Sequence, residues 1–215
     1  MQAEEGVIKY RLDFERTTLD KSFPIADLQW WFSRCRVAGL IGQNPALYEG
    51  YAYGNISQRI DQGFLISATQ TGGLDSLQFG HISWVTAFSI DSNRLSACGS
   101  LPPSSEAMTH GQIYQLRPRC HFIIHVHSPA LWNNAQVLGI PVTEPAAEYG
   151  TPEMAHEVER LLNSDQLADA GVFSMGGHED GVVAFGNDAA TAGNILFQAL
   201  NQALNKVDGQ HSTGN

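Results

Sequence analysis

The chain is short of basic residues and has no basic run. Its 215 residues include 12 lysines and arginines against 22 aspartates and glutamates, which gives a formal net charge of −10. Without a basic patch, the composition argues against a nucleic-acid-binding surface. An acidic protein can still bind a small anion where hydroxyl and backbone N–H groups supply the donors.

Long apolar runs are also missing. Hydrophobic residues make up 43% of the chain, but no stretch approaches the roughly 20 apolar residues that cross a bilayer. The first five residues, MQAEE, lack the basic start and the apolar core of a signal peptide. We therefore expect a soluble, cytoplasmic protein with no membrane partner.

Cysteine is scarce. Cys35, Cys98 and Cys120 are an odd number without paired spacing, which favours free thiols in a reducing compartment. Cys120 comes just before a histidine-bearing segment, where it is either a metal ligand or a buried thiol. A buried thiol is the commoner role for such a residue.

The chain has no internal repeat and no linker. Its length and hydrophobic content predict one domain, residues 1–207, followed by a polar, disordered tail, residues 208–215. Hydrophobic periodicity, prolines and caps predict an α/β fold in which helices cover both faces of one sheet. The expected strands are 7–14, 51–60, 63–68, 82–90, 121–126, 172–174 and 182–185, and the expected helices are 24–42, 104–116, 129–138, 151–162 and 189–206.

Two tryptophans, Trp30 and Trp31, are adjacent in the first expected helix. Neighbouring indoles can stack on a ligand, but they also pack in cores and between subunits. The apolar spacing of this helix favours packing.

A His-x-His pair closes the most apolar expected strand. His125 and His127 follow Phe122-Ile123-Ile124, and side chains at i and i+2 of a strand point to the same face. Two imidazoles can then reach one ion, and His178 and Glu106 can complete a shell of three nitrogens and one oxygen. His-x-His alone is a weak signal, so the interpretation depends on its neighbours.

Three polar segments precede this strand. They are Gly54–Arg59, Ser67–Gly73 and Pro103–Glu106. Each contains glycines or hydroxyls that can present backbone N–H groups or side-chain donors to an anion. Each alone also fits an ordinary turn or helix cap. Together they predict a phosphate or carboxylate pocket beside the metal.

Two charged side chains in these segments have open roles. Arg59 can contact the substrate or pair with a structural carboxylate. Glu106 stands in the first turn of a helix, where any carboxylate is favoured by the helix dipole. The pattern Ser104-Ser105-Glu106, followed at helical spacing by His110 and Tyr114, is more specific than the dipole alone explains. We interpret His110 as a core residue or a residue behind the ligands.

The order of these motifs resembles the class II aldolase/adducin family. The motifs are Gly-Asn-x-Ser-x-Arg, Thr-Gly, Ser-Ser-Glu, His-x-His and a later histidine, and the resemblance covers roughly residues 25–200. It implies a single-domain, three-layer α/β/α fold with a mostly antiparallel central sheet. It also implies a fourfold homotetramer with sites near subunit interfaces.

The resemblance assigns roles to residues at matching positions. His125, His127 and His178 would hold Zn²⁺ or a similar divalent ion such as Mn²⁺, Fe²⁺ or Co²⁺, and Glu106 would be the acid/base that also approaches the metal. The substrate phosphate would be bound by Asn55, Thr71, Gly72, Ser104 and Ser105.

The implied activity is carbon–carbon cleavage of a small hydroxy-carbonyl compound, a sugar phosphate, through a metal-stabilised enediolate. A divalent ion held by neutral imidazoles is a suitable Lewis acid for such an oxyanion, and a carboxylate can move the proton. Dehydration or decarboxylation in the same family, or a non-catalytic interaction module like adducin's, are the alternatives.

Three departures from the family pattern bear on this choice. The connection at 139–149 is short, and we do not assign its Tyr149 the catalytic role that a tyrosine has in family aldolases; Glu144 and Glu148 there fit solvated loop carboxylates. The chain ends soon after Lys206 without a further tyrosine. His178 is followed by Glu179 and Asp180 before the glycine, and either carboxylate can offer an oxygen to the ion.

Overall fold

The computed structural model describes residues 7–164 and 166–212, with side chains described as far as Lys206. Within these residues, eight strands form one sheet. Adjacent strands of this sheet are antiparallel, except that the first two in the spatial order given next are parallel. The strands in spatial order are β1 (Arg11–Arg16), β7 (Arg94–Gly99), β6 (Ile82–Ser89), β5 (Phe64–Ser67), β4 (Asn55–Arg59), β8 (Phe122–His127), β10 (Gly181–Gly186) and β9 (Gly171–Ser174).

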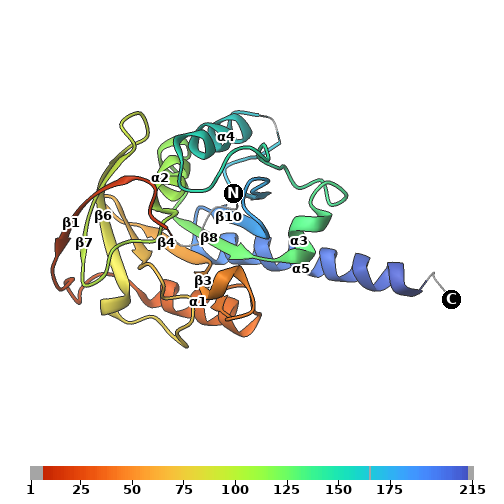
Figure 1. Cartoon of the computed structure of the whole chain (residues 1–215), viewed down its shortest axis with the longest axis horizontal. Helices are drawn as coiled ribbons and strands as arrows, with labels where there is room; N and C mark the ends of the chain where they lie inside the picture. Colours follow the sequence, from red (N-terminus) through yellow and green to blue (C-terminus); the bar gives the residue numbers. More distant parts are fainter. Residues whose placement is uncertain (1–6, 165, 213–215) are drawn as a thin grey trace.

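Helices cover both faces of this sheet, as Figure 1 shows. One face packs on α2 (Ala107–Leu116) and α4 (Pro152–Leu162), and the other on α1 (Ala26–Val37), α3 (Pro129–Asn134) and α5 (Ala189–Ser212). Short elements complete the chain: β2 (Gly42–Gln43) pairs with β3 (Ala52–Tyr53), and two 3₁₀ turns are η1 (Tyr48–Gly50) and η2 (Phe79–His81). The predicted three-layer fold with a mostly antiparallel sheet is confirmed.

The central strand β8 separates two hydrophobic cores. Its alternate residues face opposite sides, so Ile123 joins the core under α2 and α4, whereas Ile124 and Val126 join the core under α1, α3 and α5. All six residues of β8 are buried. By the same alternation, His125 and His127 lie on the face of Ile123, which is the face that α2 covers.

Two local signals account for the elements that border the site. The Thr151 hydroxyl accepts a hydrogen bond from the Met154 N–H, and Pro152 occupies the first turn of α4, where its missing N–H costs nothing. Gly54 has φ +76°, and a Cβ there would lie 2.7 Å from the Ile41 side chain. Glycine therefore interrupts the strand expected at 51–60, which the structure divides into β3 and β4.

Other boundaries differ from the sequence predictions. The strand β7 was not predicted, because it contains Ala97 and Gly99, which have weak strand preference. The helix α3 ends at Asn134 rather than 138, where turn-type hydrogen bonds replace the helical ladder. The helix α5 reaches Ser212, beyond the expected end at 206. The tail expected at 208–215 lies partly outside the described residues and stays a prediction.

Among the residues that the structure describes, no helix is long and apolar enough to cross a membrane.

Candidate metal centre

Two neighbouring elements bring the three predicted histidine ligands together. His125 and His127 lie on β8, between β4 and β10. His178 lies in the turn that joins β9 to β10, and Gly181 at the end of this turn pairs with His127. A hydrogen bond from the Gly181 N–H to the His178 carbonyl closes the turn at 2.9 Å. The antiparallel register thus places His178 over the end of β8.

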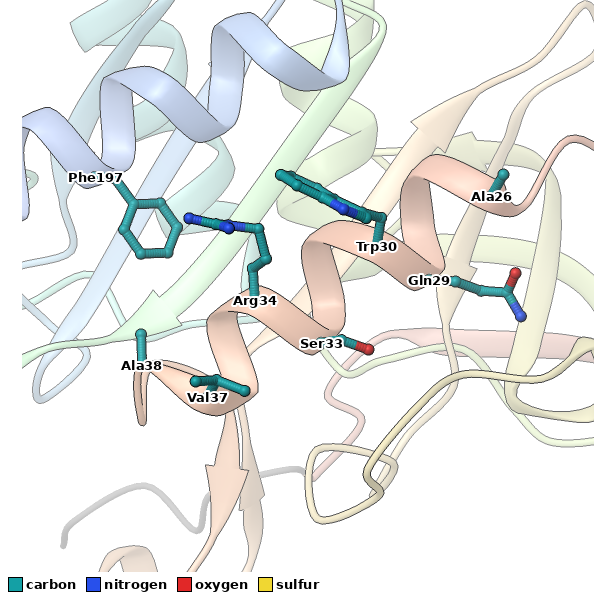
Figure 2. A pocket seen from close by; sticks show the side chains of 8 residues that line it. All are labelled: Ala26, Gln29, Trp30, Ser33, Arg34, Val37, Ala38 and Phe197. Atoms are coloured by element: carbon teal, nitrogen blue, oxygen red, sulfur yellow. The ribbon is translucent and has the colours of Figure 1, made fainter.

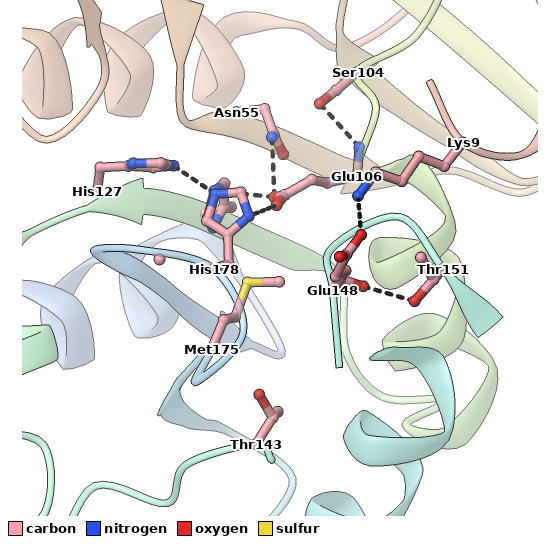
Figure 3. Close-up of polar contacts among 12 residues, drawn as sticks. Lys9, Asn55, Ser104, Glu106, His127, Thr143, Glu148, Thr151, Met175 and His178 are labelled. Atoms are coloured by element: carbon pink, nitrogen blue, oxygen red, sulfur yellow. Dashed lines mark hydrogen bonds and ion pairs between the residues drawn. The ribbon is translucent and has the colours of Figure 1, made fainter. Parts of the chain in front are cut away.

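The three imidazoles converge closely. One ligand nitrogen from each of His125, His127 and His178 lies within 4.8 Å of the others. The Nε2 atoms of His127 and His178 are 2.8 Å apart. All three side chains are buried, and Figure 3 shows the rings of His127 and His178 pointing toward each other. In the described part of the chain, the carboxylates of Glu179 and Asp180 do not belong to this cluster.

Glu106 lies beside the same cluster. It is the N-cap of α2 and is 1% exposed. Its Oε2 lies 3.0 Å from His125 Nε2, and its Oε1 lies 3.5 Å from His178 Nδ1. The Asn55 amide donates a hydrogen bond to Oε2 at 3.3 Å. The carboxylate is therefore held between the histidines and the start of β4.

Burial keeps the histidines neutral. It lowers the pKa of His125 to about 3, against a partly compensating hydrogen bond with the Val182 backbone. Burial, followed by the neighbouring histidines, lowers the pKa of His127 well below its ordinary value. Burial, followed by the neighbouring His125 and Lys9, does the same to the pKa of His178. Each ring therefore offers a nitrogen lone pair at neutral pH.

This donor set fits a divalent transition metal. Imidazole nitrogens and carboxylate oxygens are ligands of zinc and related ions, and catalytic zinc sites commonly use three protein ligands. Two imidazole nitrogens on one tetrahedral zinc lie about 3.3 Å apart, given bonds of about 2.0 Å. The 2.8 Å separation between His127 and His178 and the 4.8 Å limit for the whole cluster bracket that value. His125, His127 and His178 would hold the ion, with Glu106 adjacent.

A small polar cavity lies on the side of Glu106, since its lining includes Asn55, which donates to Glu106, and Ser105, which precedes Glu106 in the chain. Ten residues from three segments line it, and five of the six predicted substrate residues are among them: Asn55, Thr71, Gly72, Ser104 and Ser105. Some of their polar groups also stabilise the local fold, since the Thr71 hydroxyl donates to the Ala68 carbonyl and the Ser104 hydroxyl accepts from the Glu106 N–H. Gly72 is required sterically, because a Cβ there would lie 2.7 Å from two carbonyl oxygens.

The sixth predicted substrate residue, Arg59, lies elsewhere. Its guanidinium donates hydrogen bonds to the backbone carbonyls of Tyr114, Arg117 and Cys120 and lies 4.7 Å from the centre of the Tyr114 ring. It is not among the residues that line the cavity. The structure does not bring Arg59 together with the other five, and these contacts join the end of β4 to α2 and to the connection between α2 and β8.

His110 lies behind the cluster, not in it. Its Nδ1 is 2.7 Å from the Ser57 hydroxyl, which is also 2.8 Å from the Tyr114 hydroxyl. Burial, followed by His125, lowers the pKa of His110 well below its ordinary value. The expectation of a core residue or one behind the ligands agrees with this position.

Three residues near the cluster were not assigned to the site from the sequence. The Tyr149 ring lies 4.6 Å from that of His178, and the Lys9 ammonium lies 4.2 Å from the Tyr149 ring centre. The Tyr48 ring lies 4.5 Å from that of His127, and its hydroxyl donates to Asp180 at 2.6 Å. Burial, followed by the hydrogen bond with Asp180, raises the pKa of Tyr48, so the hydroxyl stays protonated.

A second, apolar hollow of about 660 Å³ lies between α1 and α5, away from the histidines. The Arg34 guanidinium lies 4.9 Å from the Trp30 ring and 5.6 Å from the Phe197 ring, between the two (Figure 2). Trp31 is buried in the core, whereas Trp30 is 52% exposed. The lining includes no acid, histidine or cysteine, so the candidate chemistry belongs to the histidine cluster.

Comparisons with known proteins point in the same direction. A search of curated proteins found no match. Among solved structures, L-fuculose-1-phosphate aldolase from Thermus thermophilus superposes with a TM-score of 0.64 at 18% identity, covering 88% of this chain and 96% of that chain. A sugar-phosphate aldolase from Thermotoga maritima gives a TM-score of 0.67 at 19% identity, covering 89% and 96%. At these identities the likeness establishes the fold alone.

The family follows from the sequence comparison. A domain model described as the class II aldolase and adducin N-terminal domain matches residues 46–204. This range contains the histidine cluster, Glu106 and the five predicted substrate residues that line the cavity. The chain therefore belongs to the class II aldolase and adducin N-terminal domain family.

Proposed function

We propose that this protein is a divalent-metal-dependent lyase that cleaves a carbon–carbon bond in a small hydroxy-carbonyl compound, a sugar phosphate. One observation carries the proposal: three buried, neutral imidazoles and a buried carboxylate converge beside a polar cavity. A scaffold needs none of these groups. Burying four titratable side chains next to one another costs free energy, and a bound ion would offset that cost.

The cavity would bind the anionic end of the substrate. Its lining contains the hydroxyls of Thr69, Thr71, Ser104 and Ser105 and the backbone of Gly72, and it contains no lysine or arginine. Neutral donors can hold a phosphate through hydrogen bonds, and the adjoining start of α2 adds a favourable dipole. The anion would then fix the rest of the substrate toward Glu106.

Glu106 would transfer the proton. Its carboxylate would accept the proton of the hydroxyl on the carbon that becomes the aldehyde. The carbon–carbon bond would break, its electron pair would move to the ketone oxygen, and Glu106 would return the proton to the carbon left behind. A divalent ion bound by the histidines supplies a Lewis acid that polarises such an oxygen. The Asn55 amide, 3.3 Å from Glu106 Oε2, would keep the carboxylate oriented.

Dehydration or decarboxylation of a related substrate would use the same groups, so the test must report the bond broken. Metal-loaded protein is incubated with a panel of ketose and aldose phosphates and their unphosphorylated forms, and the products are identified by mass spectrometry. The proposal predicts two carbonyl fragments from a phosphorylated substrate, in the wild type and not in Glu106→Gln. Products formed by loss of water or of carbon dioxide would support the alternative reaction instead of aldol cleavage. No product from any substrate would favour an interaction module.

Three further features belong to this proposal. We propose Zn²⁺ as the ion, with Mn²⁺, Fe²⁺ and Co²⁺ as alternatives, which titration of metal-free protein with each ion would rank. We propose a homotetramer, which light scattering would measure, with the exposed Trp30 hollow as a candidate contact. We propose a cytoplasmic, carbohydrate-metabolising role, with which the three free cysteines agree.

A further inference from the structure

A hydrogen bond joins two distant segments at the rim of the histidine cluster. Tyr48 belongs to the turn η1, and Asp180 belongs to the turn that carries His178. The Tyr48 hydroxyl donates to Asp180 Oδ2 at 2.6 Å, across 132 positions of sequence. Both side chains are half-buried. Neither segment lies in the main sheet, so this contact is a direct link between the two turns.

Both partners have unusual backbone conformations. Tyr48 has φ 47° and Asp180 has φ 61°, and Glu49 beside Tyr48 has φ 57°. Residues with a Cβ rarely adopt this left-handed region. They persist in it where the surrounding contacts over-determine the conformation, and such sites cluster around functional groups. The two turns therefore hold a geometry that neither would prefer alone.

Each partner also contacts a predicted metal ligand or its neighbour. The Tyr48 ring lies edge-on to that of His127 at 4.5 Å, and the Tyr53 ring lies 5.0 Å from that of Tyr48. The Asp180 carbonyl accepts a hydrogen bond at 2.8 Å from the N–H of Ser128, the residue after His127. The backbone of Asp180 thus connects the turn of His178 to the end of β8. Its side chain connects the same turn to Tyr48, whose ring lies beside that of His127.

We propose that Tyr48 and Asp180 form a positioning pair that holds His127 and His178 in the orientation required to bind the metal and that slows the ion's escape. This inference rests on the proposed function, because it requires the histidines to bind an ion. Tyr48 covers the edge of His127, and the carboxylate of Asp180 fixes Tyr48 in that place. Groups that orient metal ligands typically change metal affinity by about 10- to 100-fold when they are mutated.

The test measures zinc release into a chromophoric chelator and the visible absorption of the cobalt-substituted protein. Tyr48→Phe keeps the ring and removes the hydrogen bond, whereas Asp180→Ala removes the acceptor. We expect each variant to release zinc about 10-fold faster and to shift the cobalt bands. The double variant should match the single ones, because both changes break the same bond. Tyr51→Phe, in the same region without a described hydrogen bond from its hydroxyl, should behave as wild type.

A conservative variant separates positioning from ligation. Asp180→Asn keeps an oxygen that accepts from Tyr48, and asparagine tolerates the left-handed conformation. We expect it to restore slow release and the wild-type cobalt spectrum. If Asp180→Asn instead loses stoichiometric metal while Tyr48→Phe retains it, Asp180 is a ligand and the proposal is overturned.

The remaining outcomes separate this inference from the proposed function. Wild-type protein that binds no metal would overturn both. Wild-type protein that binds metal, with unchanged release rates and cobalt spectra in Tyr48→Phe and Asp180→Ala, would overturn the positioning pair and leave the metal site intact. Multiplied effects in the double variant would show that the two residues act separately, which also contradicts the proposal.

Discussion

The metal-free protein should lose stability between pH 7.0 and pH 5.5. His110, His125, His127 and His178 are buried, and burial lowers the pKa of each below the ordinary value of 6.5. In the unfolded chain these side chains regain that ordinary value. Below about pH 6.5 the unfolded state therefore binds more protons than the folded state, so stability falls as the pH falls.

The size of the effect follows from the same values. For one histidine that stays neutral when folded, the penalty is RT ln(1 + 10^(6.5 − pH)), about 1.4 kcal/mol at pH 5.5 and about 0.2 kcal/mol at pH 7.0. Each histidine thus costs about 1.3 kcal/mol over this interval. Four of them cost about 5 kcal/mol, which is comparable to the whole stability of many domains.

Urea denaturation of metal-free protein at both pH values measures this difference. His125→Asn removes one titrating group and should reduce the pH dependence by about a quarter. A free energy of unfolding that is equal at pH 7.0 and pH 5.5 would refute the reasoning, because it would mean that the histidines bind protons as readily in the folded state as in the unfolded one.

Three substitutions test other parts of the account. Glu106→Gln should retain the metal and lower turnover by about 100-fold or more, which metal analysis and steady-state kinetics check; turnover close to that of the wild type would remove Glu106 from catalysis. Gly181→Ala places a Cβ 2.6 Å from the His178 ring and should weaken zinc binding, which calorimetry measures. Gly80→Ala is the control, because the space around Gly80 is open, and it should bind zinc as the wild type does. Equal zinc affinities of the two variants would contradict the geometry. Arg59→Met leaves three carbonyls without their donor and should lower the free energy of unfolding, measured in urea, by about 2–4 kcal/mol. Its metal content should not change. Unchanged stability together with weaker substrate binding would instead indicate that Arg59 contacts the substrate.

The parts of the site that local patterns predict are those whose geometry is set within one element. The i, i+2 spacing of His125 and His127 needs only a strand to place both rings on one face, and β8 is that strand. Ser104, Ser105 and Glu106 come together because they lead into the start of a helix. The layered fold likewise follows from hydrophobic periodicity, which records the buried face of each element.

The parts that local patterns do not predict depend on contacts between distant segments. The Tyr48–Asp180 bond spans 132 positions, and no property of either residue's neighbours indicates the other. Arg59 ends a motif that suggests substrate contact, but α2 and the connection from α2 to β8 bring three backbone carbonyls within its reach. Competition among such long-range contacts decides the final role of a polar side chain, and a local sequence pattern does not indicate which contact prevails.

The central claim is that His125, His127 and His178 hold a divalent ion. Elemental analysis of untagged wild-type protein beside His125→Ala tests it most directly, with circular dichroism to establish that the variant is folded. The account predicts about one ion per chain in the wild type and a loss of that ion in the folded variant. A wild-type protein that carries no metal, even after incubation with zinc or manganese, would contradict it.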